Sequence, residues 1–490
     1  MRTIVEQILD YSDSQPNKIA ITDGNTSISY LELANSIFYA KEILTKKYKL
    51  KKGDYVLVAA NKQPEFVPLY LACHIIGAIV LPIAPDTNLK RYSFIKELLH
   101  PQLVVEYDDD SSEKKIFLNE FIGKKEKESF CLSLEQPADI MFTTGTTGAP
   151  KGVLLSQKNI AAAATNINQF IGNKKSDVEM IVLPISHSFG IGRMRCALYN
   201  GQTIVLLGSF FNVKRFYKFI REYKVSGFGM VPSSWSLLKK LSGMKLAEYK
   251  DQLHYIEIGS APMPISEKEL LLKTFTHTRI CMHYGLTEAS RSTFMEFHEC
   301  KDRLSTIGKP SPNVKVLICD ESGHEVPCGN EGEICVKGDS VSSGYINTKQ
   351  DSFFWGDYFR TGDWGVKSKD GFISLISRKK ELINIGGKKV SPIEVEEVLK
   401  TFDFVVDCAC IGVSDPKGVL GEVIKAFIVC SLPELPSREY IDEMIGKKLE
   451  GYKHPTFYEQ INAIPKTDSG KVQRLLLQRG LSHVATTKDL

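Results

Sequence analysis

The chain lacks the features that mark secreted, zinc-binding or membrane-spanning proteins. Its eleven cysteines include no C-x-x-C pair and its ten histidines are scattered, so neither a disulfide framework nor a zinc cluster is expected. The N-terminal segment M-R-T-I-V-E-Q-I-L-D has no apolar signal core. The apolar run from Pro68 to Ala84 is interrupted by His74 and Gly77, which favours a buried helix and strand. We therefore expect a cytoplasmic protein without a membrane span.

The chain also has no strong excess of charge. It contains 62 basic and 58 acidic side chains, a formal net charge of +4, so we expect no nucleic-acid partner. At 490 residues it is too long for one hydrophobic core and should divide into at least two or three domains or subdomains.

Strand-like and helix-like segments alternate through most of the chain, which predicts an α/β fold with a largely parallel sheet. Shorter runs with turn signals begin near Lys315 and predict a β-rich, more antiparallel subdomain. A small α+β unit follows Ser377. The expected helices and strands are 55–60, 64–76, 78–82, 180–183, 203–207, 227–231, 391–401, 405–412, 422–430 and 438–449. We therefore expect an N-terminal domain at 1–377, a boundary at 378–381 and a C-terminal domain at 382–490.

The most informative stretch runs from Thr143 to Gly152 and reads T-T-G-T-T-G-A-P-K-G. Glycines permit close backbone approach, and the hydroxyls and the Lys151 ammonium add donors, so the segment can wrap a polyphosphate. Pro150 stands directly before Lys151 and Gly152 follows it, which excludes the Walker A spacing. Taken alone, the stretch could also be a solvated turn.

This loop resembles the signature of the adenylate-forming superfamily, which contains acyl-CoA and aryl-acid ligases, luciferases and peptide-synthetase adenylation domains. The resemblance runs in order from I-S-Y-L-E-L at 28–33 to P-K-T-D-S-G-K at 465–471. It implies a large N-terminal domain of parallel-rich α/β subdomains plus a β-rich subdomain, and a small mobile α+β C-terminal domain. It also implies that ATP and Mg²⁺ are bound.

The segment Y-G-L-T-E at 284–288 is the second specific element. The resemblance places Tyr284 on adenine, Thr287 on the α-phosphate and Glu288 on Mg²⁺; a generic interpretation makes Tyr284 a core residue and Glu288 a surface residue. Asp363 and Arg378 correspond to ribose-binding residues, although either residue alone could belong to a turn or an ion pair. The nucleotide-binding residues implied by the resemblance are Thr143, Thr144, Gly145, Thr146, Thr147, Gly148, Lys151, Gly259, Ser260, Ala261, Tyr284, Asp363 and Arg378.

Lys471 lies in a polar loop near the C-terminus, where a lysine is usually exposed and idle. The resemblance makes it the catalytic lysine that bridges the substrate carboxylate and the α-phosphate. Attack of a carboxylate on ATP brings two anions together, so cations at that point lower the barrier. The resemblance further implies a hinge at Lys380 and places Gly387 in the thiol tunnel; a hairpin glycine is the alternative for Gly387.

The acid pocket is implied at His187, Phe228, Gly229 and His283, although His187 could equally be a packed histidine. No aspartate occurs between Pro184 and Gly192 to hold a substrate ammonium, which disfavours amino acids. His283 should shorten the tunnel, so we expect an aryl acid or a short to medium acid.

The segment L-E-G-Y-K-H-P at 449–455 is similar to that of acid–CoA ligases, which favours CoA as acceptor. I-N-I-G-G at 383–387 instead resembles aryl-acid activators that load the phosphopantetheine of an acyl carrier protein. An inactive acid- or nucleotide-binding member is a third interpretation, disfavoured because Glu288, Asp363, Arg378 and Lys471 are all present.

Overall fold

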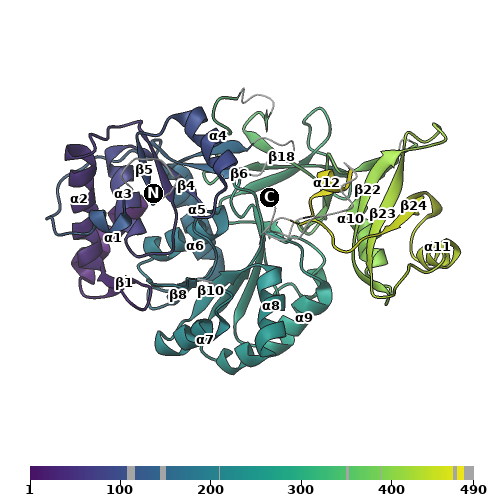
Figure 1. Ribbon diagram of the computed structural model, residues 1–490, viewed down its shortest axis with the longest axis horizontal. Helices are drawn as coiled ribbons and strands as arrows, with labels where there is room; N and C mark the ends of the chain where they lie inside the picture. The colour runs from purple at the N-terminus through teal and green to yellow at the C-terminus, as the bar shows by residue number, and fades with distance from the viewer. Residues whose placement is uncertain are drawn as a thin grey trace. The chain divides into compact units, whose positions relative to one another are not determined.

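The structure is a computed structural model that describes residues 1–106, 116–143, 150–208, 210–348, 353–386, 388–466 and 472–478. The chain forms two compact units (Figure 1). The first comprises Met1–Val316 and Val336–Phe359, and the second comprises Leu317–Cys335 and Arg360–Leu490. The expected domain ends at 377 and 382 and the hinge between them stay predictions.

Among the described residues, the larger sheet has nine strands in the order β14-β13-β12-β11-β10-β8-β9-β1-β2. Neighbouring strands from β12 to β1 run parallel, with antiparallel pairs at both ends. The carboxyl ends of the parallel strands therefore meet at one edge, where α/β proteins bind ligands. The strands are β1 (Ile19–Thr22), β2 (Ser27–Ser29), β8 (Val178–Ile181), β9 (Thr203–Leu206), β10 (Gly227–Met230), β11 (Tyr255–Ile258), β12 (Arg279–Tyr284), β13 (Thr293–Glu296) and β14 (Lys309–Pro310).

A second sheet of the first unit has the order β5-β3-β4-β6-β7. Its strands are parallel except β7, which returns antiparallel to β6. The strands are β3 (Tyr55–Ala59), β4 (Ile79–Ile83), β5 (Leu103–Val105), β6 (Pro137–Thr143) and β7 (Lys151–Ser156). The stretch from Thr143 to Gly152, called the phosphate loop below, therefore includes the connection between the two strands of a β-hairpin.

Helices cover both faces of the larger sheet. Buried side chains of α7, α8 and α9 pack on one face and those of α5 and α6 pack on the other (Figure 1). Helices α1, α2 and α5 begin with capping boxes formed by Thr3, Ser29 and Ser156. The helices are α1 (Ile4–Ser14), α2 (Tyr30–Lys46), α3 (Phe66–Ile76), α4 (Leu89–Leu99), η1 (Leu118–Phe121), α5 (Gln157–Ile171), α6 (Ser188–Tyr199), α7 (Val213–Glu222), α8 (Pro232–Ser242), η2 (Lys245–Tyr249), α9 (Ile265–Thr274) and η3 (Lys301–Arg303).

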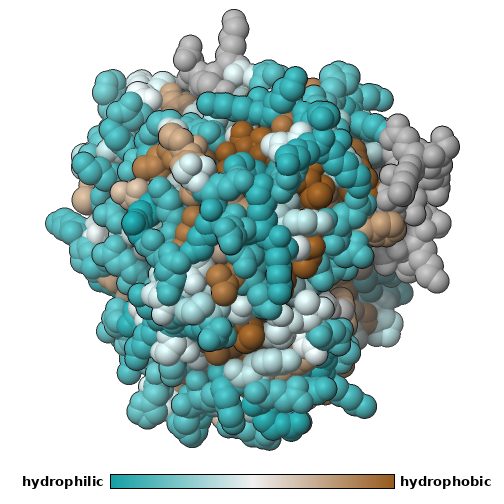
Figure 2. All heavy atoms as spheres, turned by 90° about the vertical axis from the view of Figure 1, so that its left-hand side faces the viewer, coloured by the Kyte–Doolittle hydropathy of each residue, from teal (hydrophilic) through white to brown (hydrophobic). Residues whose placement is uncertain are grey.

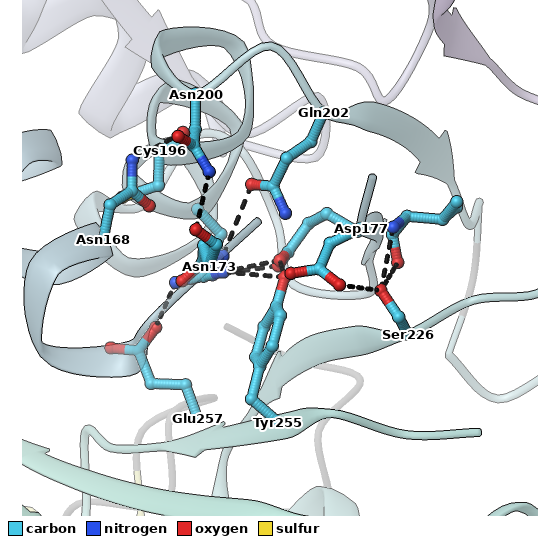
Figure 3. Close-up of polar contacts among 12 residues, drawn as sticks. Asn168, Asn173, Asp177, Cys196, Asn200, Gln202, Ser226, Tyr255 and Glu257 are labelled. Carbon is cyan, nitrogen blue, oxygen red and sulfur yellow. Dashed lines mark hydrogen bonds and ion pairs between the residues drawn. The ribbon is translucent and has the colours of Figure 1, made fainter. Parts of the chain in front are cut away.

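Polar side chains tie the amino ends of three parallel strands together. Asp177 precedes β8, Ser226 precedes β10 and His254 precedes β11. The Ser226 hydroxyl donates to Oδ1 of Asp177 at 3.0 Å (Figure 3). Nδ1 of His254 lies 2.6 Å from the same oxygen. This edge is therefore closed by internal hydrogen bonds, and the loops at the opposite edge are left to form a site.

The second unit contains shorter strands and a separate core, as expected for β-rich and α+β parts. Strands β15-β16-β18-β17 follow this order in one sheet, and β19 pairs with β18. Buried side chains of α10, β22, β23 and α11 form the core of the C-terminal part. The elements from Lys315 onward, of which β17 belongs to the first unit, are β15 (Lys315–Cys319), β16 (Glu331–Lys337), β17 (Phe354–Trp355), β18 (Tyr358–Lys367), β19 (Ile373–Arg378), β20 (Ile383–Ile385), β21 (Lys388–Val390), α10 (Pro392–Leu399), β22 (Val405–Ser414), β23 (Glu422–Cys430), α11 (Arg438–Gly446), η5 (Gly451–Lys453), β24 (Phe457–Gln460) and α12 (Arg474–Gln478).

The molecular face shown in Figure 2 is mostly hydrophilic, and hydrophobic side chains reach it only in small separate areas. The apolar run singled out in the sequence forms α3 and β4, which are buried. In the part of the chain that the structure describes, every helix is too short or too polar to cross a membrane.

Candidate active site

The phosphate loop is held at its two ends by the β6–β7 hairpin. Thr143 pairs with Lys151 across the hairpin, and the Thr143 hydroxyl donates to the Lys151 carbonyl at 3.4 Å. On the β6 side, the Arg91 guanidinium donates to the Phe142 carbonyl at 3.1 Å. These contacts hold the base of the loop. The expected phosphate-binding residues Thr144, Gly145, Thr146, Thr147 and Gly148 lie outside the described residues.

The Lys151 side chain lies against two aromatic rings. Its ammonium is 4.9 Å from the centre of the Tyr345 ring and 4.9 Å from that of Phe353. The rings themselves meet edge to face, with centres 4.7 Å apart. Such cation–π contacts stabilise a lysine by about 0.5–2 kcal/mol, depending on its exposure to water. The side chain of Lys151 is thereby held beside these two rings.

The Y-G-L-T-E segment lies at the carboxyl end of β12. The Thr287 hydroxyl donates to the hydroxyl of Ser188, at the start of α6, at 3.3 Å. Glu288 is buried, with 8% of its surface exposed, and its Oε1 accepts a hydrogen bond from the Tyr345 hydroxyl at 2.6 Å. Glu288 therefore carries a carboxylate in a sheltered position, contrary to the generic interpretation as a surface residue.

The segment 341–346 connects this loop with the phosphate hairpin. Val341 bridges Ala289, and the Ser342 amide donates to the Glu288 carbonyl at 2.8 Å. At its other end Tyr345 bridges Val153 of β7. Tyr345 was missed in the sequence because S-G-Y-I-N reads as an ordinary turn and its partners are distant in the chain. Only the pairing in space identifies it.

His283 lies over Gly259 at the carboxyl edge of the sheet. A Cβ atom at Gly259 would come within 2.1 Å of the imidazole ring, so only glycine fits under it. The ring also meets Phe189 edge to face, with centres 4.7 Å apart. Nδ1 of His283 lies 2.7 Å from Oε1 of Glu257, although the two atoms are not aligned as a hydrogen bond. The imidazole is therefore packed on both faces and beside a carboxylate.

A balanced set of buried charges lies beneath His283. Glu257 is contacted by Arg291 at 3.0 Å and by Arg193 at 3.2 Å. Arg193 also donates from Nε to Glu179 at 2.9 Å. Two carboxylates and two guanidiniums thus compensate one another; Figure 3 shows Glu257 within its polar surroundings.

The pKa values follow from this balance. Burial alone would raise the pKa of Glu257, but Arg291, His283 and Arg193 outweigh it and hold this pKa below the ordinary value. Burial lowers the pKa of His283, and its attraction to Glu257 does not compensate. A protonated His283 would be a buried third cation beside two balanced pairs. His283 is therefore neutral at physiological pH.

The other expected pocket residues differ in their surroundings. His187 is exposed and occupies the N-cap position of α6, where its side chain makes no capping hydrogen bond. A Cβ atom at Gly229 would come within 3.0 Å of the Phe189 ring, whereas the buried Phe228 ring packs against Phe216 on the opposite face. Neighbouring residues of a strand face opposite sides, so Phe228 and Gly229 do not line one pocket. The expectation for Phe228 is corrected accordingly: it is a core residue.

A small cavity of about 20 Å³ lies behind Thr287, between α5 and α6. Ser188, Arg195 and Ser290 line it together with apolar residues of α5. This volume holds a single water molecule and no substrate. The cavity therefore belongs to the supporting structure of the Y-G-L-T-E loop.

In the second unit, Asp363 and Arg378 face each other on β18 and β19. Nε of Arg378 lies 2.8 Å from Oδ1 of Asp363, which is nearly buried. The ion pair that the sequence left open is therefore present, and it fixes the direction of a carboxylate next to a glycine turn. Lys380 follows in an exposed turn.

The expected catalytic lysine lies outside the described residues, as does Gly387. The stem of the Lys471 loop is described: Lys466 bridges Val472. Directly after it, Arg474 donates to Glu396 at 2.6 Å and to Glu381 at 2.8 Å. The base of this loop is therefore anchored to α10 and to the turn that contains Lys380.

The described residues contain no group of three or more His, Cys, Asp and Glu side chains that could hold a metal by themselves. Mg²⁺ is commonly held by one or two carboxylates together with substrate phosphates. The lone, sheltered carboxylate of Glu288 fits this second kind of site.

The chain matches two family models. The model of the AMP-binding enzyme covers residues 10–346, and that of the AMP-binding enzyme C-terminal domain covers residues 394–471. Among similar curated proteins, the 4-coumarate–CoA ligase-like 9 of Arabidopsis thaliana is 30% identical over 95% of this chain and 86% of its own length. The 2-succinylbenzoate–CoA ligase of Staphylococcus epidermidis is 28% identical over 95% of both chains.

Solved structures share the fold across both units. ATP-bound MatB from Rhodopseudomonas palustris has a TM-score of 0.88 at 25% identity and covers 98% of this chain and 99% of its own. The o-succinylbenzoate CoA synthetase MenE from Bacillus subtilis, in complex with its acyl-adenylate, has a TM-score of 0.85 at 23% identity over 99% of both chains. The long motif order, the fold and the two family matches agree, and the chain belongs to the AMP-binding enzyme family of AMP-forming, adenylate-forming ligases.

Proposed function

We propose that this AMP-forming acid–CoA ligase activates a simple carboxylic acid, either an aryl acid or one of short to medium length. The observation that carries the substrate class is the packing of the neutral His283 ring between Gly259 and Phe189. A rigid imidazole at this place shortens the space available to an acid. The absence of an aspartate between Pro184 and Gly192 further disfavours an α-amino acid.

The nucleotide site is proposed as follows. The phosphate loop with Lys151 binds the polyphosphate, Gly259 to Ala261 and Tyr284 hold adenine, and Asp363 with Arg378 binds ribose. The backbone of Ser260 has a positive φ of 73°, so the chain turns sharply where the base would lie. The contact with Arg378 supports the role of Asp363 because it fixes the direction of this carboxylate, and carboxylate oxygens accept hydrogen bonds from hydroxyl groups such as those of ribose.

The chemistry of the first half-reaction follows from charge. The substrate carboxylate attacks the α-phosphorus, a bond to the pyrophosphate breaks, and the acyl-adenylate forms. Thr287 is proposed to donate to the α-phosphate, and Lys471 is proposed to bridge both reacting anions. Glu288 would hold Mg²⁺, which would supply Lewis-acid stabilisation of the phosphate charge. Loss of one preorganised donor of this kind costs about 3 to 4 kcal/mol of barrier.

In the second half-reaction a thiol attacks the acyl carbonyl and AMP leaves. The thiol needs the space that Lys471 occupies in the first step, so we propose that the C-terminal part rotates at Lys380. The exposed turn at Lys380 permits the backbone change that this requires. CoA is the proposed acceptor, with Gly387 in its tunnel; the phosphopantetheine arm of a carrier protein is the alternative.

Exchange of pyrophosphate into ATP over a panel of acids tests the substrate class. Benzoate-type and short to medium acids should support faster exchange than α-amino acids or palmitate. The best acid is then offered with CoA or with a phosphopantetheinylated carrier protein, and thioester formation is measured. Faster exchange with amino acids or efficient use of palmitate would refute the proposed class, and a carrier thioester formed in preference to the CoA thioester would refute the proposed acceptor.

A further inference from the structure

The proposed metal ligand Glu288 is oriented by a neutral donor. The Tyr345 hydroxyl donates to Oε1 of Glu288 at 2.6 Å, a short hydrogen bond of the kind that ionised acceptors make. The backbone of Glu288 is also fixed, since its carbonyl accepts from the Ser342 amide at 2.8 Å. Both the main chain and one carboxylate oxygen of this residue are therefore held by the segment 341–346.

Tyr345 is itself held in place. Its backbone bridges Val153, the third residue of β7, and its ring meets Phe353 edge to face. The Lys151 ammonium lies 4.9 Å from the centres of both rings. These contacts restrict the ring, so the hydroxyl has a defined direction toward Glu288.

The kind of donor matters for the charge of the site. Lys151 and Glu288 both contact Tyr345, but these two described side chains form no ion pair with each other. A lysine bound directly to the carboxylate would cancel its charge, whereas a phenol orients it and leaves the charge intact. A carboxylate that is oriented and still negative is suited to bind a cation.

We propose that Tyr345 is a positioning residue for the magnesium-binding carboxylate. Its hydroxyl holds Oε1 of Glu288 and so presents the carboxylate to Mg²⁺ bound with ATP. Hydrogen-bond partners that orient metal-binding carboxylates typically contribute about 10- to 100-fold to metal affinity or activity. This inference rests on the proposed role of Glu288.

The test compares the affinity for MgATP with that for metal-free ATP by calorimetry, without acid or CoA. The Tyr345→Phe variant keeps the ring beside Lys151 and removes only the donor. It should weaken MgATP binding by about 10-fold and leave the binding of metal-free ATP unchanged. A thermal melt without ligand checks that the variant is folded.

Two further variants separate the explanations. Tyr440→Phe removes an exposed phenol of α11 in the second unit, so the ratio of the affinity for MgATP to that for metal-free ATP should stay as in the wild type. Glu288→Gln should lower the affinity for MgATP relative to that for metal-free ATP. Adding Tyr345→Phe to this variant should cause no further loss of MgATP affinity. If Tyr345→Phe leaves the ratio unchanged while Glu288→Gln lowers it, the role of Tyr345 is overturned and that of Glu288 stands. If Glu288→Gln leaves the ratio unchanged, both are overturned.

Discussion

Nδ1 of His283 lies 2.7 Å from Oε1 of Glu257, and the imidazole is nevertheless neutral because burial lowers its pKa and the nearby Arg291 and Arg193 lower it further. In the proposed acid site, His283 would therefore act through its volume and its polar edge rather than through charge. Glu257 is buried among these charged groups, so we expect it to contribute to the stability of the fold.

Replacing His283 with a smaller residue should allow the enzyme to accept longer acids. The His283→Ala variant frees the space over Gly259, and the preference for an acid longer by several methylenes should rise about 10-fold or more. The ratio of kcat/KM values for long and short acids measures this. His324→Ala, which removes an exposed histidine of the second unit, is the control. An unchanged chain-length preference in His283→Ala would show that the ring does not limit the pocket.

Replacing Glu257 should destabilise the first unit in a pH-dependent way. Glu257→Gln leaves two buried arginines without their shared carboxylate, a loss of about 3–5 kcal/mol. The folded pKa of Glu257 is lowered, so its contribution is present above the unfolded value of about 4.3 and is lost as pH falls toward the folded value. The difference in free energy of unfolding between the variant and the wild type should be constant from about pH 5 to 8 and should become smaller below about pH 4.

Denaturant unfolding of the wild type and the Glu257→Gln variant at several pH values measures this difference. Glu299→Gln is the matched control, because Glu299 is exposed and pairs with Arg279 on the surface, where such pairs contribute about 0–1 kcal/mol. A Glu257→Gln variant as stable as this control would contradict the expectation.

Arg474 should stabilise the C-terminal part of the second unit. Arg474→Met leaves Glu396 buried without its cation; burial already raises the pKa of this carboxyl, and Arg474 opposes the rise. We expect a local loss of about 3 kcal/mol, read as faster amide hydrogen exchange in β22 and β23. Lys447→Met, which breaks an exposed pair with Glu443, should leave exchange unchanged. Equal exchange in both variants would speak against an anchoring role.

Removing the proposed catalytic lysine should separate the half-reactions. Lys471→Ala should abolish pyrophosphate exchange, whereas transfer from a synthetic acyl-adenylate to CoA should continue because that step does not need this cation. Calorimetric ATP binding should be retained, which shows that the fold is intact. Normal exchange in this variant would overturn the proposed mechanism.

Much of the architecture could be predicted from local patterns. The strands at β3, β8, β9 and β10 follow hydrophobic runs, and α10 begins where Ser391 and Pro392 give a cap and a first turn. The family and its reaction followed from motifs that are contiguous in sequence. Such motifs can be recognised in the sequence because their residues are neighbours in the chain.

What could not be predicted depends on distant pairs. Tyr345 and Glu288 are 57 residues apart, and Arg193 meets Glu257 across 64 residues. Neither pair leaves a periodic or local signal. The side on which Phe228 lies was also missed, since a strand buried on both faces reads as one apolar run.

The bonds made by 341–346 have a consequence for engineering this enzyme. The segment is bonded to Ala289 at one end and to Val153 at the other, so the β6–β7 hairpin and the Y-G-L-T-E loop share one support. A chimera that takes its phosphate hairpin from a relative would meet a foreign partner strand at Tyr345. Exchanges of 143–156, 284–291 and 341–346 should therefore succeed when all three are moved together and fail when they are moved singly.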